Sequence, residues 1–300
     1  MINKNPFSIK TIKDFPLSKL TTFGIGGPAK LFCYVQTNEE LIKVVVDARK
    51  KNLDFFILGG GSNILIADSG FPGLVIKTGN DKIVCQKNQI TAQSGSSLAN
   101  LVSSAIKNNL SGLECCLGIP GTVGGAIVGN AGAKDDWISK TISKVTVLNQ
   151  NNQLQTLTNK QCQFDYRASR FQNSKEIIFQ AEFNLEPATK KQLEKNQQKF
   201  LLLREKQPRE KSAGSIFKNP NGNSAGQLID QAGLKGKKIN DAQISNQHAN
   251  FIINNNHASA QDVLSLIRLI QGEVFSRFGV KLELEIRLIG FTKPEIIGII

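Results

Sequence analysis

The feature that most constrains the fold is a segment of sixteen residues, 118–133, in which glycine occupies six positions and the other residues are mostly small or apolar. Glycine has no Cβ, so its backbone can approach a ligand closely, but its conformational freedom disfavours a regular helix. We therefore expect a loop here, one that permits close contact with a flat or anionic ligand. A tight buried turn of small residues is the alternative.

A second glycine run joins two short apolar runs, 54–58 and 64–66, and reads Gly59-Gly60-Gly61-Ser62-Asn63. Its unhindered N–H groups can cradle phosphate oxygens. It is not a Walker A loop, which needs Gly-Lys-Ser/Thr, and a strand rather than a helix follows it, unlike the dinucleotide fingerprint. Alone, the run is equally compatible with a tight turn between strands. Two glycine-rich loops in one domain fit a bound dinucleotide.

Local patterns predict an α+β architecture. Residues that can cap a helix precede apolar stripes at Thr37, Ser97, Thr189 and Ser259, and the second of these helices should end near Gly112. Alternating or short apolar runs predict strands at 31–35, 54–58, 64–66, 145–148, 154–157, 177–185 and 250–254. Strict alternation over 281–289 predicts one long final strand with a polar face. Pro187 closes the first half, so we place a domain boundary there.

Composition narrows the function classes. A net charge of +13 suits polyanions, anionic membranes or small molecules that carry phosphate. The five cysteines form no CxxC pair, and the chain has only two histidines, so we expect neither a disulfide framework nor a metal site. Neither the first thirteen residues nor any later stretch has an apolar run of signal-peptide or membrane-span length. We expect a cytoplasmic protein that does not enter a membrane.

Six motifs occur in order between about residues 20 and 290, and together they resemble one family. They are TTFGIGGPA at 21–29, GGGSN at 59–63, GIPGTVGGAIVGNAGA at 118–133, FDYRAS at 164–169, AGSIFKNP at 213–220 and EIRLIG at 285–290. This set is similar to the UDP-N-acetylenolpyruvoylglucosamine reductases, the MurB enzymes of bacterial peptidoglycan synthesis. The stretch 187–215 is too short for the insertion of the longer subtype, so the resemblance is to the short one.

The resemblance implies an FAD-binding fold of the vanillyl-alcohol-oxidase type in residues 1–187, divided into two subdomains near 78, and a substrate-binding domain in 188–300. It implies that NADPH reduces a bound FAD, which passes hydride to UDP-N-acetylglucosamine enolpyruvate and gives UDP-N-acetylmuramate. Hydride and electron chemistry of this kind belongs to the cofactor. We expect a monomer without a nucleic-acid partner.

The resemblance also implies residue roles. Arg167 would bind the substrate carboxylate, Glu285 would polarise it, and Ser215 would donate the proton to the carbanion carbon, whereas Glu283 should be solvated. Substrate contacts would come from Tyr166, Lys206 and Asn219. Residues expected to hold the FAD are Gly59, Gly60, Gly61, Ser62, Asn63, Gly118, Ile119, Pro120, Gly121, Gly124, Gly125, Asn130, Ala131 and Gly132.

One departure and two rival functions stay open. Members of the short subtype commonly carry a positive residue where this chain has Gly24, so a contact there is lost or replaced.

A sugar or alcohol oxidase of the same fold is the nearest rival, although the two histidines, His248 and His257, lie outside the glycine-rich half and do not favour a covalent flavin. A basic nucleic-acid-binding protein is the rival from another class, but no recognisable binding motif supports it. His248 is at least as compatible with a structural role as with a substrate contact.

Overall fold

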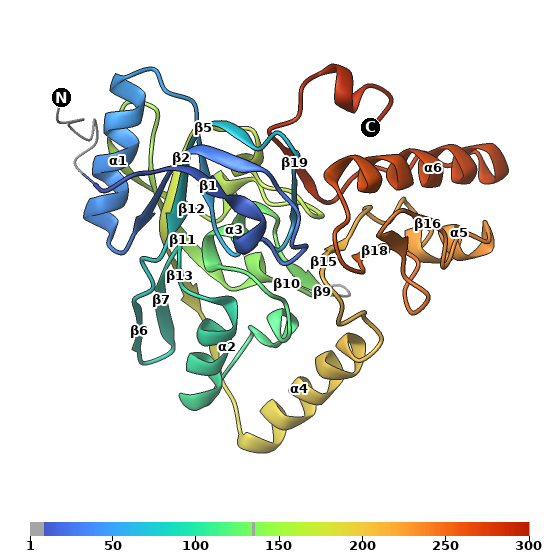
Figure 1. The fold of residues 1–300 in the computed structure, drawn as a ribbon. Helices are drawn as coiled ribbons and strands as arrows, with labels where there is room; N and C mark the ends of the chain where they lie inside the picture. Colours follow the sequence, from blue (N-terminus) through green and yellow to red (C-terminus); the bar gives the residue numbers. More distant parts are fainter. Residues whose placement is uncertain (1–8, 134–135, 300) are drawn as a thin grey trace, which may run out of the picture. The chain divides into compact units, whose positions relative to one another are not determined.

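The computed structural model describes residues 9–133 and 136–299 (Figure 1). The first eight residues, on which the expected absence of a signal segment partly depends, lie outside this description. The described chain forms two compact units: unit 1 comprises residues 9–11, 33–60 and 76–205, and unit 2 comprises residues 12–32, 61–75 and 206–299. The linear division into domains 1–187 and 188–300 stays a prediction, because a compact unit need not be an independently folding domain.

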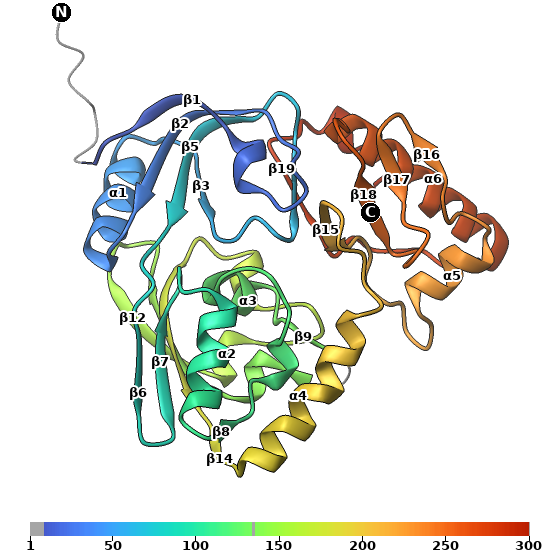
Figure 2. The ribbon, with the colours of Figure 1, turned by 60° about the horizontal axis from the view of Figure 1, so that its bottom comes forward.

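Unit 1 is built around a five-stranded sheet with the order β12-β11-β13-β7-β6. Its strands are β6 (Ile83–Gln86), β7 (Gln89–Gln93), β11 (Ile142–Leu148), β12 (Leu154–Thr158) and β13 (Ile177–Asn184), and each neighbouring pair is antiparallel. The predicted hairpin is confirmed, with Leu148 opposite Leu154. Helices α2 (Leu98–Lys107) and α3 (Val123–Val128) pack on this sheet (Figure 2).

Capping side chains start the helices of unit 1 where the sequence predicts them. Thr37 accepts a hydrogen bond at the start of α1 (Asn38–Lys50), and Ser97 does so for α2. Thr189 forms a complete capping box with Gln192 at the start of α4 (Lys190–Arg204). The expected end of α2 near Gly112 is wrong: the helix ends at Lys107, because the next residues form β8 (Leu110–Ser111), which pairs with β14 (Glu186–Pro187).

The expectation that segment 118–133 contains no regular helix is also wrong. Helix α3 lies within it and spans six residues. Thr122 caps this helix by accepting a hydrogen bond from the Gly125 N–H, and Val123 and Ile127 are buried in the core of unit 1. Packing of the apolar side chains therefore outweighs the unfavourable helix propensity of two glycines, which costs about 1 kcal/mol each.

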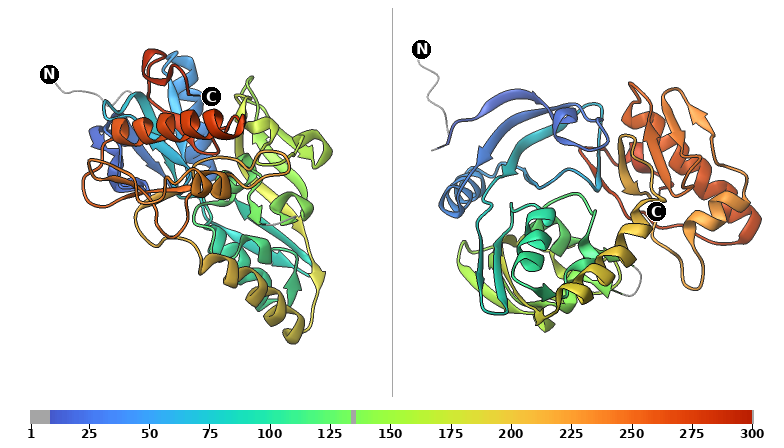
Figure 3. Two further views of the ribbon diagram at one scale, coloured as in Figure 1. Left: turned by 90° about the vertical axis from the view of Figure 1, so that its right-hand side faces the viewer. Right: turned by 90° about the horizontal axis from the view of Figure 1, so that it is seen from below.

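Unit 2 has a four-stranded antiparallel sheet with the order β15-β18-β17-β16 and a long helix, α6 (Ala260–Phe278). The strands are β15 (Ser212–Ser215), β16 (Lys238–Ile239), β17 (Ala242–Ile244) and β18 (Phe251–Asn254), and α5 (Ala225–Gln231) also packs on α6. Figure 3 shows α6 in red along one face of the orange sheet. The predicted capping box of Ser259 with Asp262 begins α6, and Gly279 ends it with a φ of 67°.

The long final strand predicted over 281–289 is not formed as such. Only β19 (Arg287–Ile289) is a strand, and it pairs in parallel with β4 (Ile64–Ile66). Leu284 makes a single bridge to Phe217. The alternation of exposed and buried side chains is nevertheless present, because Leu282 and Ile286 are buried while Lys281 and Glu283 are exposed. The alternating sequence pattern therefore predicted correctly which side chains are buried. It did not predict the length of the strand, because β4 pairs with only three residues.

Two segments that come early in the chain belong to unit 2. The buried Asn254 side chain donates a hydrogen bond to the Phe23 carbonyl at 3.0 Å and accepts one from the Ala258 N–H at 3.0 Å. Asp68 accepts hydrogen bonds from the first two N–H groups of α6, those of Ala260 and Gln261, at 2.8 and 3.1 Å. Hydrogen bonds of this kind explain why residues 12–32 and 61–75 group with the C-terminal part.

The remaining strands are either short or contain residues of both units. A four-stranded sheet has the order β1-β2-β5-β3, and the chain crosses from one unit to the other within β2 and β5. Its strands are β1 (Ile12–Pro16), β2 (Pro28–Val35), β3 (Phe55–Leu58) and β5 (Phe71–Thr78), and β9 (Gly132–Ala133) pairs with β10 (Asp136–Trp137). The predicted α+β class is confirmed. In the described part of the chain, no helix is both long and apolar enough to cross a bilayer.

Candidate active site

The two glycine-rich loops of the sequence meet in unit 1. A Cβ on Gly59 would lie 2.5 Å from the Thr122 hydroxyl oxygen, and a Cβ on Gly60 would lie 2.4 Å from the Gly121 Cα. Both distances are shorter than any contact a real Cβ makes, so the loops pack this closely only because side chains are absent at Gly59 and Gly60. Loops that were 60 residues apart in the sequence therefore present their main-chain groups together.

Main-chain hydrogen bonds fix the glycine-rich segment in place. The Gly121 carbonyl accepts a bond from the Leu98 N–H at 3.0 Å, and the Val123 and Gly124 N–H groups donate to Ser96 and Ser94 at 2.9 and 2.8 Å. These main-chain hydrogen bonds hold the segment against the loop that precedes α2. The other residues predicted to hold FAD from this segment continue along it: Gly118, Ile119, Pro120, Gly125, Ala131 and Gly132.

Arg167 lies at the tip of a tight turn. Asp165 and Ala168 exchange two main-chain hydrogen bonds, 3.0 and 3.1 Å long, and Arg167 has a left-handed backbone with a φ of 52°. Its guanidinium donates to the Gly132 carbonyl at 3.1 Å, and it lies 5.7 Å from the centre of the Trp137 ring. The turn therefore places the predicted carboxylate-binding cation directly beside the glycine-rich segment.

Asn130 connects these two parts of the site. Its side chain is buried, donates a hydrogen bond to the Asp165 carbonyl at 2.9 Å and accepts one from the Ser139 N–H at 3.3 Å. Its backbone is left-handed, with a φ of 42°, a conformation that asparagine tolerates better than most residues. The side chain of this predicted FAD ligand is thus used to join the glycine-rich segment to the Arg167 turn.

Unit 2 brings together the other two predicted catalytic residues. Ser215 ends β15, and the carbonyl of the next residue, Ile216, accepts a hydrogen bond from the Glu285 N–H at 2.8 Å. Asn63 donates from its side chain to the Glu285 carbonyl at 3.1 Å. Glu285 is half-buried, whereas the Glu283 side chain is 64% exposed, as expected for a solvated residue. Burial therefore distinguishes the carboxylates of Glu283 and Glu285.

The remaining predicted residues differ in their surroundings. Lys206 is exposed at the beginning of the C-terminal segment of unit 2. The Asn219 carboxamide accepts a hydrogen bond from the Ala225 N–H at 3.0 Å, so it helps to start α5. The Tyr166 ring makes an edge-on contact with Trp137, at 5.6 Å between centroids. Arg167 belongs to unit 1, whereas Ser215 and Glu285 belong to unit 2.

Comparisons with known proteins agree on one family. Residues 29–158 match the FAD binding domain family, and residues 207–289 match the C-terminal domain of UDP-N-acetylenolpyruvoylglucosamine reductase. The reductase of Caldanaerobacter subterraneus is 40% identical, with 92% of each chain covered, and that of Chlamydia felis is 42% identical, with 96% of this chain and 97% of the relative covered. The chain belongs to the UDP-N-acetylenolpyruvoylglucosamine reductase family. The crystal structure of the reductase from Thermus caldophilus matches it with a TM-score of 0.81 at 35% identity, over 94% of this chain and 98% of that one.

In this member of the reductase family, the sequence patterns missed three residues of the site. Trp137, the single tryptophan of the chain, lies under Arg167. Arg204, near the end of α4, donates to the Leu117 carbonyl at 3.0 Å, and a Cβ on Gly118 would be 2.9 Å from its Cγ. Burial, and then the charge of Arg167, lower the pKa of Arg204. The third residue, Lys77, donates a hydrogen bond to the Gly59 carbonyl. Of the three, only Trp137 had a signal in the sequence, because tryptophan is rare.

The departure at Gly24 from the commoner pattern of the reductase family has a structural counterpart. A Cβ on Gly24 would lie 3.1 Å from the Lys211 Cδ. Gly24 also has a φ of 68°, a conformation that favours glycine. The aliphatic part of an exposed lysine thus occupies the space that a side chain at this position would need.

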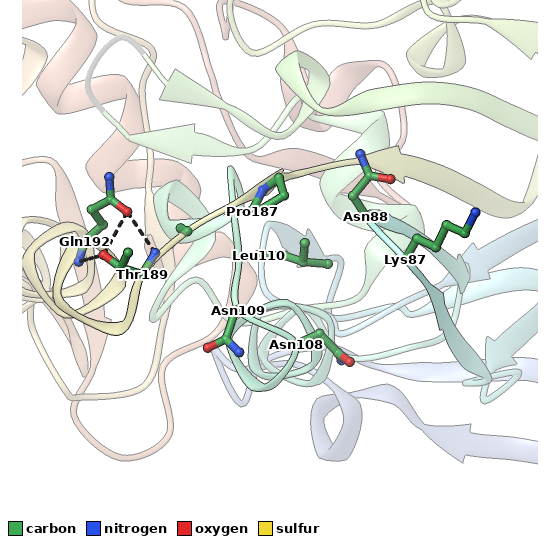
Figure 4. A pocket seen from close by; sticks show the side chains of 9 residues that line it. Lys87, Asn88, Asn108, Asn109, Leu110, Pro187, Thr189 and Gln192 are labelled. Carbon is green, nitrogen blue, oxygen red and sulfur yellow. Dashed lines mark hydrogen bonds between the residues drawn. The ribbon is translucent and has the colours of Figure 1, made fainter.

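A hollow on unit 1 lies apart from these residues of the reductase (Figure 4). It is lined by the turn between β6 and β7, the end of α2 and the beginning of α4: Lys87, Asn88, Asn108, Asn109, Leu110, Pro187, Ala188, Thr189 and Gln192. Thr189 and Gln192 use their side chains in the helix cap. Lys87 is the only charged group of the lining, and no predicted site residue contributes, so this hollow is not the candidate active site.

Proposed function

We propose that this protein reduces UDP-N-acetylglucosamine enolpyruvate to UDP-N-acetylmuramate, with NADPH as the reductant and FAD as the bound cofactor, in peptidoglycan synthesis. The observation that carries this proposal is the agreement of whole-length relatives, 40–42% identical over more than nine-tenths of the chain, on this one reductase. We also propose that it acts as a cytoplasmic monomer, which light scattering of the purified protein tests.

The residues present fit an FAD. A Cβ on Gly59 or Gly60 would collide with Thr122 or Gly121, so the two loops meet only because these positions carry no side chain. Glycine backbones without side chains suit the close approach of a large flat ligand. When bound, FAD supplies the two-electron chemistry that carries hydride from NADPH to the enolpyruvyl group. The two glycine-rich loops would hold it.

Arg167 would bind the carboxylate of the enolpyruvyl group. A guanidinium offers a planar fork of donors that matches a carboxylate, and it keeps its charge at every physiological pH. The turn at 165–168 and the bond to the Gly132 carbonyl fix its position. Negative charge that develops on the carboxylate during hydride addition would therefore meet a cation already in place.

Ser215 and Glu285 would complete the reaction. Glu285, half-buried and held through its main chain by Ile216 and Asn63, would polarise the carboxylate. The Ser215 hydroxyl would give its proton to the carbanion carbon. A hydroxyl is a weak acid, and it would act here because the acceptor is strongly basic. Tyr166, Lys206 and Asn219 would contact the UDP-sugar, with the lysine serving as a point charge for its diphosphate.

The first test follows NADPH consumption and the flavin spectrum of the purified protein with and without the enolpyruvyl substrate. We expect a yellow protein whose flavin is reduced by NADPH and which turns over NADPH continuously only when the UDP-sugar is present. Flavin that is reduced while the UDP-sugar has no effect would refute the substrate and favour an oxidase of the same fold. A colourless protein that FAD does not reconstitute would refute the cofactor, and steeply salt-dependent oligonucleotide binding would then favour the nucleic-acid function.

A second test separates the roles within the reaction. We expect Ser215→Ala to leave reduction of the flavin by NADPH unchanged and to slow its reoxidation by the substrate by about 10²–10⁴-fold, the usual contribution of a general acid. Ser212→Ala is the matched control, because Ser212 lies in the same strand and is held through its carbonyl. Equal reoxidation rates in stopped-flow measurements of both variants would remove Ser215 from the proton-donor role.

A further inference from the structure

Lys77 lies in β5 and has no part in the reaction described above. The strand occupies an inner position in its sheet, between β2 and β3, and the Lys77 side chain is half-buried. Its ammonium group donates a hydrogen bond to the Gly59 carbonyl, the first residue of the GGGSN loop. The side chain therefore brings a positive charge to the base of this loop.

This charge has no counter-ion in the described chain. Within residues 9–133 and 136–299, no carboxylate forms an ion pair with Lys77. Burial lowers the pKa of the Lys77 ammonium, with no opposing contribution from a nearby acid. Half-burying a cation without an anion is unfavourable, and charges in such positions are normally paired. A carbonyl oxygen satisfies one N–H, but it carries no net charge.

The position of Lys77 indicates which anion is missing. Gly59, which it contacts, and Gly60 are the two residues at which an added Cβ would collide with Thr122 and Gly121 of the other glycine-rich loop. The cation thus stands at the junction of the two loops, within unit 1. Main-chain N–H groups give a phosphate hydrogen bonds, but they leave most of its charge uncompensated, and a lysine is suited to supply that charge.

We propose that Lys77 binds the diphosphate of the dinucleotide cofactor and supplies a full positive charge at the junction of the two glycine-rich loops. This inference rests on the proposed function, because it takes FAD as the dinucleotide. In the holoenzyme, the ammonium keeps one bond to the Gly59 carbonyl and directs its other N–H donors to phosphate oxygens. Lys77 is then a cofactor-binding residue of this chain, and it does not touch the substrate.

The test compares three variants of the full chain stripped of flavin. Lys77→Met removes the charge and keeps the length, Lys77→Arg keeps the charge, and Lys82→Met removes an exposed lysine from the same unit. Titrations use FAD, ADP, which has the diphosphate without the flavin ring, and riboflavin, which has the ring without phosphate. Loss of one charge-assisted hydrogen bond should weaken FAD and ADP binding by Lys77→Met by about 10–100-fold.

The pattern across ligands decides the proposal. We expect Lys77→Met to bind riboflavin as the wild type does, Lys77→Arg to recover most of the FAD affinity, and Lys82→Met to match the wild type throughout. FAD affinity of Lys77→Met within threefold of the Lys82→Met value overturns the proposal. An equal loss for FAD and riboflavin also overturns it, because distortion of the loop, and not loss of charge, would then be responsible.

Thermal unfolding of the flavin-free proteins gives an independent readout. Since Lys77→Met removes an uncompensated half-buried charge, it should melt no lower than the wild type while it binds FAD more weakly. A lysine whose role is only to hold the loop predicts the opposite, a lower melting temperature. If the wild type itself binds no FAD, the proposed function fails first; if the wild type binds FAD and the variants do not differ, only the role of Lys77 fails.

Discussion

Asn130 allows the strongest test of how the site is held together. Replacing it with alanine removes the side chain that joins the glycine-rich segment to the Arg167 turn, and leaves the Asp165 carbonyl and the Ser139 N–H without these partners. Each lost hydrogen bond costs about 1 kcal/mol, so the pair accounts for roughly 2 kcal/mol. Alanine in a left-handed conformation adds about 1–2 kcal/mol of strain, since the φ of Asn130 is 42°.

Glycine at the same position separates the two contributions. It loses the hydrogen bonds but adopts the left-handed conformation without strain, while its freedom in the unfolded chain costs about 0.4–1 kcal/mol. We therefore expect Asn130→Ala to lower the free energy of unfolding by about 3 kcal/mol and Asn130→Gly by roughly 2.5 kcal/mol. Asn52 is the matched control: it is exposed and has a φ of 49°, so Asn52→Ala should lose only the strain of about 1–2 kcal/mol, and Asn52→Gly about 1 kcal/mol or less.

Two assays measure the effects of the Asn130 variants. Urea unfolding is followed by the fluorescence of Trp137, which is the only tryptophan and lies beside Arg167. Stopped-flow reoxidation of the flavin by the substrate reports on the Arg167 turn, and we expect it to slow in both variants. If Asn130→Ala and Asn52→Ala lose equal stability, the buried hydrogen bonds contribute nothing measurable and the reasoning is refuted. Unchanged reoxidation in a destabilised protein would show that Asn130 does not position Arg167.

Two further predictions concern unit 2. Asp68→Ala should lower the free energy of unfolding by about 1–2 kcal/mol in urea titrations, because two N–H groups of α6 lose their acceptor; an unchanged midpoint would contradict this. Burial lowers the pKa of His248, whose ring nitrogen accepts a hydrogen bond from Asn250, so the unfolded chain takes up a proton first as the pH falls. The folded state therefore gains stability from keeping His248 neutral; this contribution is complete above pH 6.5 and is lost as the pH falls below it. Between pH 7.5 and 5.5, the melting temperature of His248→Gln should fall less than that of the wild type.

Short-range patterns were enough to predict most of the elements. The capping box of Thr189 with Gln192 is a contact between residues three apart, so the sequence alone contains it. The errors came where distant packing decides. Helix α3 forms despite its glycines because the core of unit 1 buries its apolar side chains, and the strand at 281–289 is short because β4 offers three residues to pair with.

The site divides in the same way. Glycine-rich loops can be recognised in the sequence, because only glycine, which has no Cβ, fits where two backbones approach closely. Lys77 and Arg204 have no such signal in the sequence. The fold brings Lys77 to Gly59, 18 positions away, and Arg204 to Gly118, 86 positions away. The resemblance to a family named the catalytic candidates, but it did not indicate that Asn130 uses its side chain for the protein itself.

The GGGSN loop links the predicted FAD site to the main chain of Glu285. Gly59 and Gly60 belong to unit 1, where they meet the other glycine-rich loop, whereas Asn63 belongs to unit 2, where its side chain donates to the Glu285 carbonyl and its own carbonyl accepts from the Arg287 N–H. One loop of five residues therefore contributes to the predicted FAD site at one end, and at the other it holds the main chain of Glu285, which is predicted to polarise the substrate carboxylate. At most three residues separate Gly59 and Gly60 from Asn63, so we expect any shift of this loop on binding FAD to reach the main chain of Glu285.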